Sequence, residues 1–180
     1  MKSVLISIRP QWCKKIMSGE KTIEVRKTAP KEVPFKAYIY MTNKKPYVLT
    51  FAGNGKMRVH NGTVIGEFIC DKVERFSVGS LRSDDIQKLA CLSYYEMICY
   101  FYEPEELDGK TAKQGFAWHI SDLKIYDKPK ELGEFGNLCR KDCLRLGKGK
   151  SCEFLSTDGT PCNRIIPITR PPQSWQYVEE

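Results

Sequence analysis

The chain has 180 residues, of which 41% are hydrophobic, so it can bury the core of one domain. No apolar run approaches the roughly 18 residues of a membrane span, and the apolar part of the opening MKSVLISIRP is too short for a signal peptide. We therefore expect a cytoplasmic protein without membrane association. Its net charge is +7.

The positive charge is concentrated in the first third, where residues 1–60 hold 13 Lys or Arg against three acids. Residues 61–126 hold seven basic against 11 acidic side chains, and residues 127–180 hold nine against eight. A one-sided positive field favours phosphate-rich partners such as RNA or DNA, because each phosphate contact releases condensed counterions. A solvated surface explains the same charge, and both interpretations stay open here.

The first elements are a strand, a helix and a second strand. Residues 4–9 (VLISIR) are typical of a strand, and Pro10 follows at a position suited to the first turn of a helix. Apolar spacing predicts a helix over residues 10–18, which Gly19 ends in a left-handed conformation. Residues 19–27 (GEKTIEVRK) then predict a strand with charged side chains on both faces.

The middle of the chain predicts mainly strands. Residues 35–42 alternate as a second long strand. Residues 48–52 and 56–60 are typical of a hairpin, although a mobile loop explains them equally well. Residues 63–76 predict one long strand, in which Gly66 marks a bulge or a close backbone approach.

Two helices and a strand follow. Ser83 precedes two aspartates as the N-cap of one helix, and Ser93 with Glu96 forms the capping box of the next. Residues 115–126 return to strand character and stop before Pro129.

This order predicts an α+β fold built on a mixed, curved sheet or small β-barrel with flanking helices. We divide the chain into a domain of residues 1–132 and an appendix of residues 133–180, which is rich in Cys, Gly and Lys. Trp175 would pack the terminal segment back on the barrel.

The eight cysteines are expected to be reduced thiols or metal ligands in a cytoplasmic chain. Four sit among apolar residues and are predicted to be buried: Cys13, Cys70, Cys91 and Cys99. The other four lie within 24 residues of the appendix: Cys139, Cys143, Cys152 and Cys162. A structural zinc ion held by these four thiolates would order the appendix, whereas free thiols are the alternative, since no C-x2-C pair is present.

Gly19, Lys21, Glu24 and Arg26 spell G-x-K-x-x-E-x-R directly after an amphipathic helix. This motif resembles the hallmark of ASCH domains, which are relatives of the PUA RNA-binding fold. The flanking stretches KAYIYMT, GTVIGEFICDKVERF and FAWHISDLKIYDKP follow in the order of that family, so the resemblance covers roughly residues 2–130.

The resemblance implies a PUA-like β-barrel whose motif residues line a cleft that binds RNA or a nucleotide-like ligand. Lys21 and Arg26 would neutralise phosphate, and Glu24 would accept hydrogen bonds from a base or orient a cation. We expect Arg9 and Thr22 to join them, and Tyr47 to stack on a base from a basic loop. An ion-pair network that fixes the helix-to-strand turn is the alternative for Lys21, Glu24 and Arg26.

An enzyme is the competing hypothesis. One branch of the family resembles amidohydrolases of acylated cytidine nucleosides, with a lysine at the Lys21 position and a threonine nucleophile where this chain has Glu24. If the chain is catalytic, we expect Lys21, Glu24 and Glu67 to carry the chemistry, on a modified nucleoside or on RNA. His119 is predicted to be structural, and His60 to be exposed.

A binding module is therefore the preferred interpretation, with RNA or a nucleotide-like ligand as its partner. A hydrolase is the first alternative. A partner-binding regulatory domain that uses the cysteine-rich segment as its interface is the second.

Overall fold

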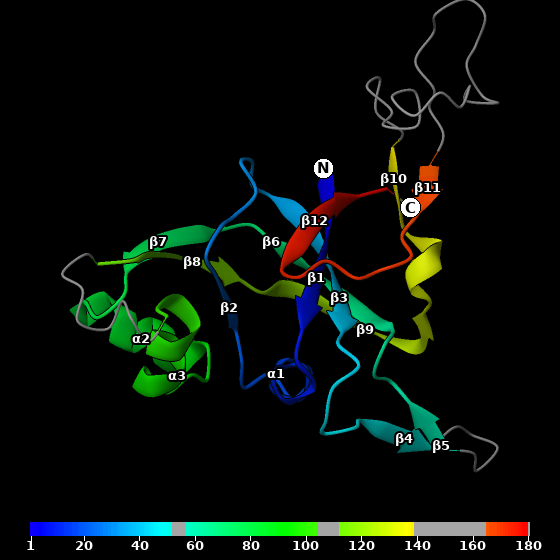
Figure 1. Ribbon diagram of the computed structural model, residues 1–180, viewed down its shortest axis with the longest axis horizontal. Coiled ribbons are helices and arrows are strands. Elements are labelled where there is room, and N and C mark those ends of the chain that lie inside the picture. Colours follow the sequence, from blue (N-terminus) through cyan, green and yellow to red (C-terminus); the bar gives the residue numbers. More distant parts are fainter. Residues whose placement is uncertain (52–56, 104–111, 139–164, 180) are drawn as a thin grey trace, which may run out of the picture.

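Five strands from both ends of the chain form the main sheet, in the order β12-β1-β3-β6-β9 (Figure 1). The computed structural model describes residues 1–51, 57–103, 112–138 and 165–179. β1 and β3 are parallel, and the other neighbours in this sheet are antiparallel. The strands are β1 (Lys2–Ile8), β3 (Phe35–Met41), β6 (Val64–Cys70), β9 (Ser121–Lys130) and β12 (Trp175–Val178).

A second, antiparallel sheet has the order β2-β8-β7, and two short ribbons complete the strands of the described ranges. The second sheet contains β2 (Ile23–Arg26), β7 (Val73–Ser77) and β8 (Gln114–His119). The ribbons pair β4 (Leu49–Phe51) with β5 (Met57–Val59) and β10 (Gly136–Leu138) with β11 (Ile165–Pro167). The hairpin predicted in the middle of the chain is therefore confirmed.

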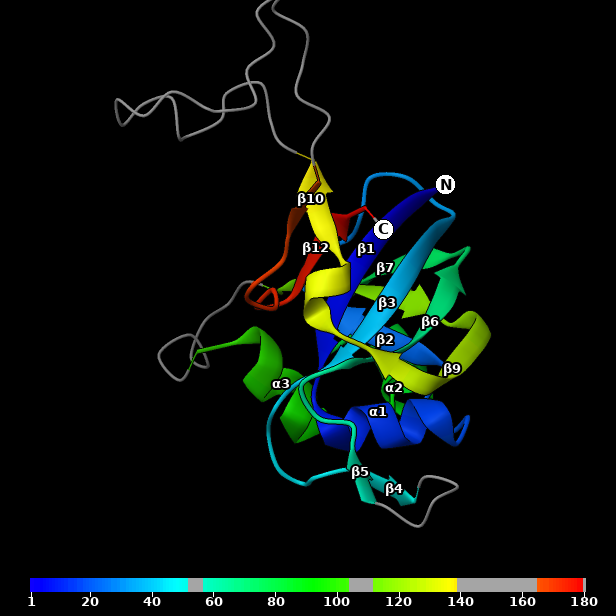
Figure 2. The same ribbon diagram turned by 90° about the vertical axis from the view of Figure 1, so that its right-hand side faces the viewer.

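Three α-helices flank the sheets: α1 (Pro10–Met17), α2 (Leu81–Leu89) and α3 (Tyr94–Phe101), and a 3-10 turn follows β9 at Leu132–Glu134. α1 begins at Pro10 and ends before Gly19, whose φ of +78° is the left-handed conformation expected of it. α1 lies below the main sheet, whereas α2 and α3 lie below the second sheet (Figures 1 and 2). No helix in the described ranges is both long enough and apolar enough to span a membrane.

The α+β class is confirmed, but the described strands form no closed barrel. Residues 63–76 make two strands instead of one, because the chain leaves the main sheet after Cys70 and joins the second sheet at Val73. Residues 115–126 also divide, since β8 ends at His119 in the second sheet and β9 starts at Ser121 in the main one. At these two points the chain passes from one sheet to the other, so the strands form two separate sheets where one closed barrel was expected.

Other expected boundaries shift. The strand expected over residues 19–27 is paired only from Ile23 to Arg26. Ser80, not Ser83, is the N-cap of α2, and the buried Ser83 hydroxyl donates to the Ser80 carbonyl instead. The Ser93 capping box is confirmed, with both of its hydrogen bonds present. β9 continues through Pro129 to Lys130, at the edge of the main sheet, where proline removes no ladder hydrogen bond.

The largest apolar cluster lies on the face of the main sheet that α1 covers. In this cluster the rings of Trp118 and Phe35 pack edge to face, with their centres 5.0 Å apart. A second cluster joins the second sheet to α2 and α3. A third cluster on the main sheet includes Phe135 and Ile168, so apolar packing continues beyond residue 132. The division of the chain at that residue stays a prediction.

Gly66 tests the expected close backbone approach. A Cβ at this position would lie 2.4 Å from the Lys124 carbonyl oxygen of β9, in a stretch where the pairing of β6 with β9 changes register. We expect Gly66→Ala to lower the free energy of unfolding by about 1–3 kcal/mol, because backbone must move. Urea unfolding followed by circular dichroism measures this loss.

Gly133→Ala is the matched control, since its Cβ would meet no atom within 4 Å. We expect it to change stability by no more than about 0.5 kcal/mol. Equal losses in the two variants would contradict the packing argument.

Candidate functional site

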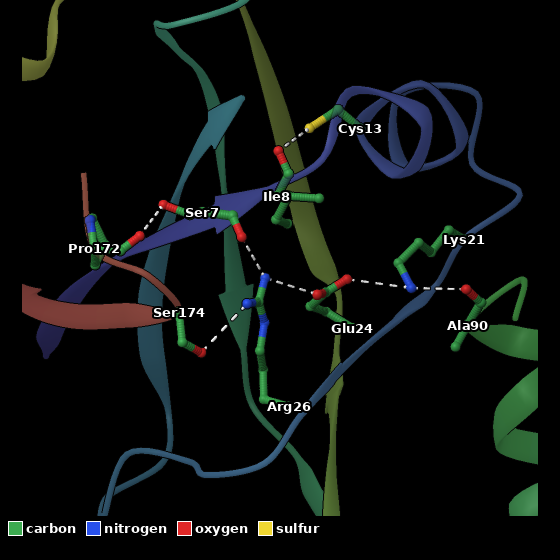
Figure 3. Close-up of polar contacts among 9 residues, drawn as sticks. All are labelled: Ser7, Ile8, Cys13, Lys21, Glu24, Arg26, Ala90, Pro172 and Ser174. Atoms are coloured by element: carbon green, nitrogen blue, oxygen red, sulfur yellow. Dashed lines mark hydrogen bonds and ion pairs between the residues drawn. The ribbon is translucent and has the colours of Figure 1, made fainter. Parts of the chain in front are cut away.

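Lys21, Glu24 and Arg26 form a buried ion triad (Figure 3). Lys21 Nζ lies 3.2 Å from Glu24 Oε2, and Arg26 Nη2 lies 2.9 Å from Glu24 Oε1. The three residues are only 3%, 6% and 6% exposed. One carboxylate is therefore held between two cations, away from water.

The turn between α1 and β2 positions this triad. After Gly19, the Lys21 backbone N–H donates to the Lys15 carbonyl, which folds the chain back against α1. β2 then places Ile23 and Val25 in the cluster between the second sheet and the helices α2 and α3. Its other face carries Glu24 and Arg26, so all four residues of β2 are buried, two as core and two as ions.

Backbone carbonyls supply further acceptors for both cations. Lys21 Nζ donates to the Ala90 carbonyl at 2.8 Å, at the C-terminal end of α2. Arg26 Nη2 donates to the Ser7 carbonyl of β1 at 2.7 Å. These bonds satisfy donors that burial removes from water, which a buried ion pair requires for stability.

The segment before β12 contacts both β1 and the triad. Ser7 Oγ donates to the Pro172 carbonyl at 2.6 Å, and the Ser7 N–H donates to the Ser174 carbonyl at 2.9 Å. Arg26 Nη1 donates to Ser174 Oγ at 3.4 Å (Figure 3). No local sequence pattern links Ser7 and Ser174 to Arg26, or Ala90 to Lys21, so the sequence alone does not reveal these partners.

A cavity of about 800 Å³ opens over the triad. Its walls come from β1, α1, β2, the loop after β3, α3 and the segment before β12. The residues that line it are Ser7, Ile8, Arg9, Gln11, Trp12, Lys21, Glu24, Val25, Arg26, Tyr40, Thr42, Asn43, Lys44, Leu92, Glu96, Cys99, Tyr100, Pro171, Pro172 and Gln173. This volume lies within the range of small-molecule sites.

The structure places the other predicted binding residues differently. Arg9 lines the cavity from the start of α1, together with the triad. Thr22 is exposed outside the lining, and its carbonyl accepts from the Ile120 N–H where the chain passes from β8 to β9. Tyr47 is 52% exposed, as expected for a stacking residue, but it too lies outside the lining.

Glu67, the third residue expected of a catalytic site, also lies elsewhere. It sits on β6, where its carboxylate accepts from the Tyr126 hydroxyl and lies 4.0 Å from Lys36 Nζ. The structure thus brings Lys21 and Glu24 together without Glu67.

Both histidines are held in the fold. His119 Nε2 lies 2.6 Å from Glu74 Oε1 across the β7–β8 pair, which agrees with the structural role expected of it. The expectation that His60 is exposed is wrong. It is 7% exposed, because its N–H pairs with Val48 and its carbonyl accepts from the Thr63 hydroxyl below the hairpin.

The cysteine predictions hold in part. Cys13 and Cys70 are fully buried, but Cys91 is half-buried and Cys99 is exposed, since it points from α3 toward the cavity side rather than into the core. The four cysteines of the expected zinc site lie outside the described residues, so zinc stays a prediction. Within the described ranges, no group of three or more His, Cys, Asp or Glu side chains could hold a metal ion.

One thiol and one phenol near the triad have pKa values above their ordinary ones. Burial raises the pKa of the Cys13 thiol well above its ordinary value, and the nearby Glu24 carboxylate adds to the effect. Burial also raises the pKa of Tyr100, although the Arg26 guanidinium acts in the opposite direction. Both groups are therefore neutral at physiological pH.

Solved structures of an ASCH protein have the same fold as this chain. An ASCH protein from Zymomonas mobilis aligns over 99% of this chain and 89% of its own, with a TM-score of 0.57 and 22% identity. Two point mutants of that protein align with TM-scores of 0.57 and 0.56, each at 20% identity, over 100% and 99% of this chain and 92% and 89% of theirs. This chain has the ASCH fold.

The ASCH fold confirms the resemblance drawn from the Lys21, Glu24 and Arg26 motif at the level of architecture. A scan against models of protein families finds no match, and a search of curated proteins finds none either.

Glu24→Gln tests the triad. The substitution keeps the shape of the side chain but leaves two buried cations without a carboxylate, so we expect the free energy of unfolding to fall by about 3–5 kcal/mol. Glu20→Gln is the control, because Glu20 is exposed and its Oε2 lies 3.7 Å from Nζ of the half-buried Lys15. Its expected change is no more than about 1 kcal/mol. Denaturant unfolding that finds the two variants equally stable would show that the triad adds nothing.

Thiol labelling tests the cysteine environments. A raised pKa leaves less thiolate at pH 8, and burial blocks access, so iodoacetamide should alkylate Cys13 and Cys70 far more slowly than Cys99. For Cys70, burial raises the pKa to about 12. Peptide mass spectrometry after timed labelling gives each rate, and denatured protein gives the reference. Labelling of Cys13 as fast as Cys99 in the folded protein would contradict the buried site.

Proposed function

We propose that the cavity over Lys21, Glu24 and Arg26 binds RNA or a nucleotide-like ligand and that the protein is a binding module. The observation that carries this proposal is the composition of the cavity. Four basic side chains line it, from Arg9, Lys21, Arg26 and Lys44, together with the rings of Trp12, Tyr40 and Tyr100. Cations with aromatic surfaces are what a phosphate-bearing base requires.

Unsatisfied polar atoms at the cavity support a ligand. Three buried side-chain nitrogen or oxygen atoms of the described residues have no hydrogen-bond partner, and two of them belong to lining residues, as Arg26 Nε and Thr42 Oγ1. Buried polar groups in native proteins are nearly always paired, so their concentration here favours a polar occupant.

The hydrolase alternative has weaker support. It needs a carboxylate or lysine that is free to exchange a proton with substrate, whereas both Glu24 oxygens and Lys21 Nζ are held in ion pairs and hydrogen bonds. The regulatory alternative rests on the cysteine-rich segment, which lies outside the described residues. Like the cytoplasmic location, it stays a prediction.

Charge reversal at the edge of the cavity tests the binding function. Lys44 is exposed and lines the cavity, so Lys44→Glu should leave the fold intact and weaken the binding of single-stranded RNA by about tenfold or more, as repulsion replaces a phosphate contact. Fluorescence anisotropy with a labelled octanucleotide measures the affinity. The affinity of the unaltered protein should fall linearly with salt on logarithmic axes.

Lys128→Glu is the matched control, because Lys128 is exposed on β9 outside the lining and the substitution changes the net charge equally. An equal loss of RNA affinity in both variants would show that only the net charge matters, and it would contradict a binding site in the cavity. Cleavage of the RNA on a denaturing gel would replace the binding function with the hydrolase alternative.

A further inference from the structure

We infer that the cavity takes a single nucleotide unit base-first, with its phosphate held at the rim by Arg9 and Lys44 instead of at the buried triad. This inference rests on the proposed function and adds the orientation and chemical class of the ligand. It follows from which cations of the cavity already have ion-pair and hydrogen-bond partners and which do not.

Several donors of the interior cations already have partners, although Arg26 Nε has none among the described residues. Arg26 Nη2 already donates to Glu24 and to the Ser7 carbonyl, and Lys21 Nζ already contacts Glu24 and the Ala90 carbonyl (Figure 3). A phosphate placed there would also face the Glu24 carboxylate at close range. Like charges in a buried site repel strongly, since the local dielectric is low.

The same interior suits a neutral base. Two cations against one carboxylate leave a net charge of +1 on the floor of the cavity, shared by side chains that already have partners. Carbonyl oxygens of a nucleobase are neutral acceptors, and Lys21 Nζ has three donor hydrogens, of which its two contacts use two. The floor therefore offers hydrogen bonds without requiring an anion.

The rim carries the charges that remain available. Arg9 and Lys44 are exposed, line the cavity, and have no side-chain ion pair within the described part of the chain. The remaining acid of the lining, Glu96, accepts from the Ser93 N–H and hydroxyl in the capping box of α3, and the two cations outnumber its one negative charge. The rim is thus basic.

Two features fix this rim in place. The Asn61 amide donates to the Lys44 carbonyl at 2.6 Å, and its Oδ1 accepts from the Val48 N–H at 2.8 Å, so the loop that carries Lys44 is tied down. Arg9 directly precedes α1, which has no acid in its first turn, so the helix N-terminus adds a partial positive charge beside it. A phosphate at this rim would meet prearranged cations.

Flat apolar surfaces connect rim and floor. Trp12 and Tyr100 line the cavity from α1 and α3, and Lys21 Nζ lies 5.6 Å from the centre of the Trp12 ring. Tyr100 is 37% exposed and is part of the lining, so the residue can contact a ligand. A base that enters past these rings can stack on them before its polar edge reaches Lys21.

Binding of nucleosides and nucleotides, measured by isothermal titration calorimetry, tests the orientation. The probes are the four ribonucleosides, their 5′-monophosphates, inorganic phosphate and a mixed-sequence RNA octamer. We expect the double variant Arg9→Ala with Lys44→Ala to weaken the best-bound monophosphate and the octamer by about tenfold, while the affinity for the matching nucleoside changes less than twofold. The control, Lys88→Ala with Lys128→Ala, removes the same charge from exposed positions outside the lining and should change neither.

Tyr100→Leu gives the complementary result. Loss of the ring should weaken nucleoside and monophosphate alike, by about fivefold or more, because both would stack on it. Thermal unfolding of each variant confirms that the fold is kept.

Three outcomes would overturn the orientation: equal effects of the rim variant on nucleoside and monophosphate, no effect of it on either, or inorganic phosphate that binds as tightly as the monophosphate while nucleosides do not bind. Absence of binding by any probe to the unaltered protein would instead refute the proposed function itself. If the orientation holds, an octamer that binds much more tightly than the monophosphate identifies an RNA strand as the source of the nucleotide, and equal affinities identify a free nucleotide.

Discussion

A buried carboxylate between two buried cations is the constraint around which the rest of the structure is arranged. Taking three charges out of water costs several kcal/mol for each ion unless every remaining donor and acceptor finds a partner. The partners of Lys21, Glu24 and Arg26 come from the first strand, the end of α2 and the segment before β12. The need to satisfy one triad therefore draws together parts of the chain that are up to 148 residues apart.

The triad also separates the cations of the cavity into two groups, those that are buried and paired and those that are exposed. Its carboxylate pairs with both cations and holds them in place, so the triad fixes the shape and polarity of the floor, whereas Arg9 and Lys44 are exposed cations of the lining. The basic balance of the first third of the chain thus has two different consequences. Some of its cations stabilise the fold in ion pairs, and others remain available to an anion, a difference that net charge alone does not reveal.

Local patterns were sufficient for the elements that local chemistry determines. Pro10 and Gly19 bound α1 as expected, Ser93 caps α3 through its own neighbour Glu96, and Gly66 marks a close approach. They were insufficient wherever hydrogen-bond partners lie far away in the chain. The strand periodicity of residues 63–76 and 115–126 continues through both changes of sheet, so alternation predicts one strand where the backbone pairs with two different sheets. The motif identified Lys21, Glu24 and Arg26, but their depth of burial depends on Ser7, Ala90 and Ser174, which no spacing rule connects to them.

The strand β12 pairs with β1 in antiparallel fashion, next to the parallel pair of β1 and β3. During synthesis, β1 and the whole G-x-K-x-x-E-x-R motif leave the ribosome before the cavity wall formed by Pro171 to Gln173. Until then one edge of β1 is unpaired, and Arg26 lacks the Ser174 hydroxyl. The motif residues are therefore present in the chain well before the segment that completes the cavity wall, so the motif by itself does not make the cavity.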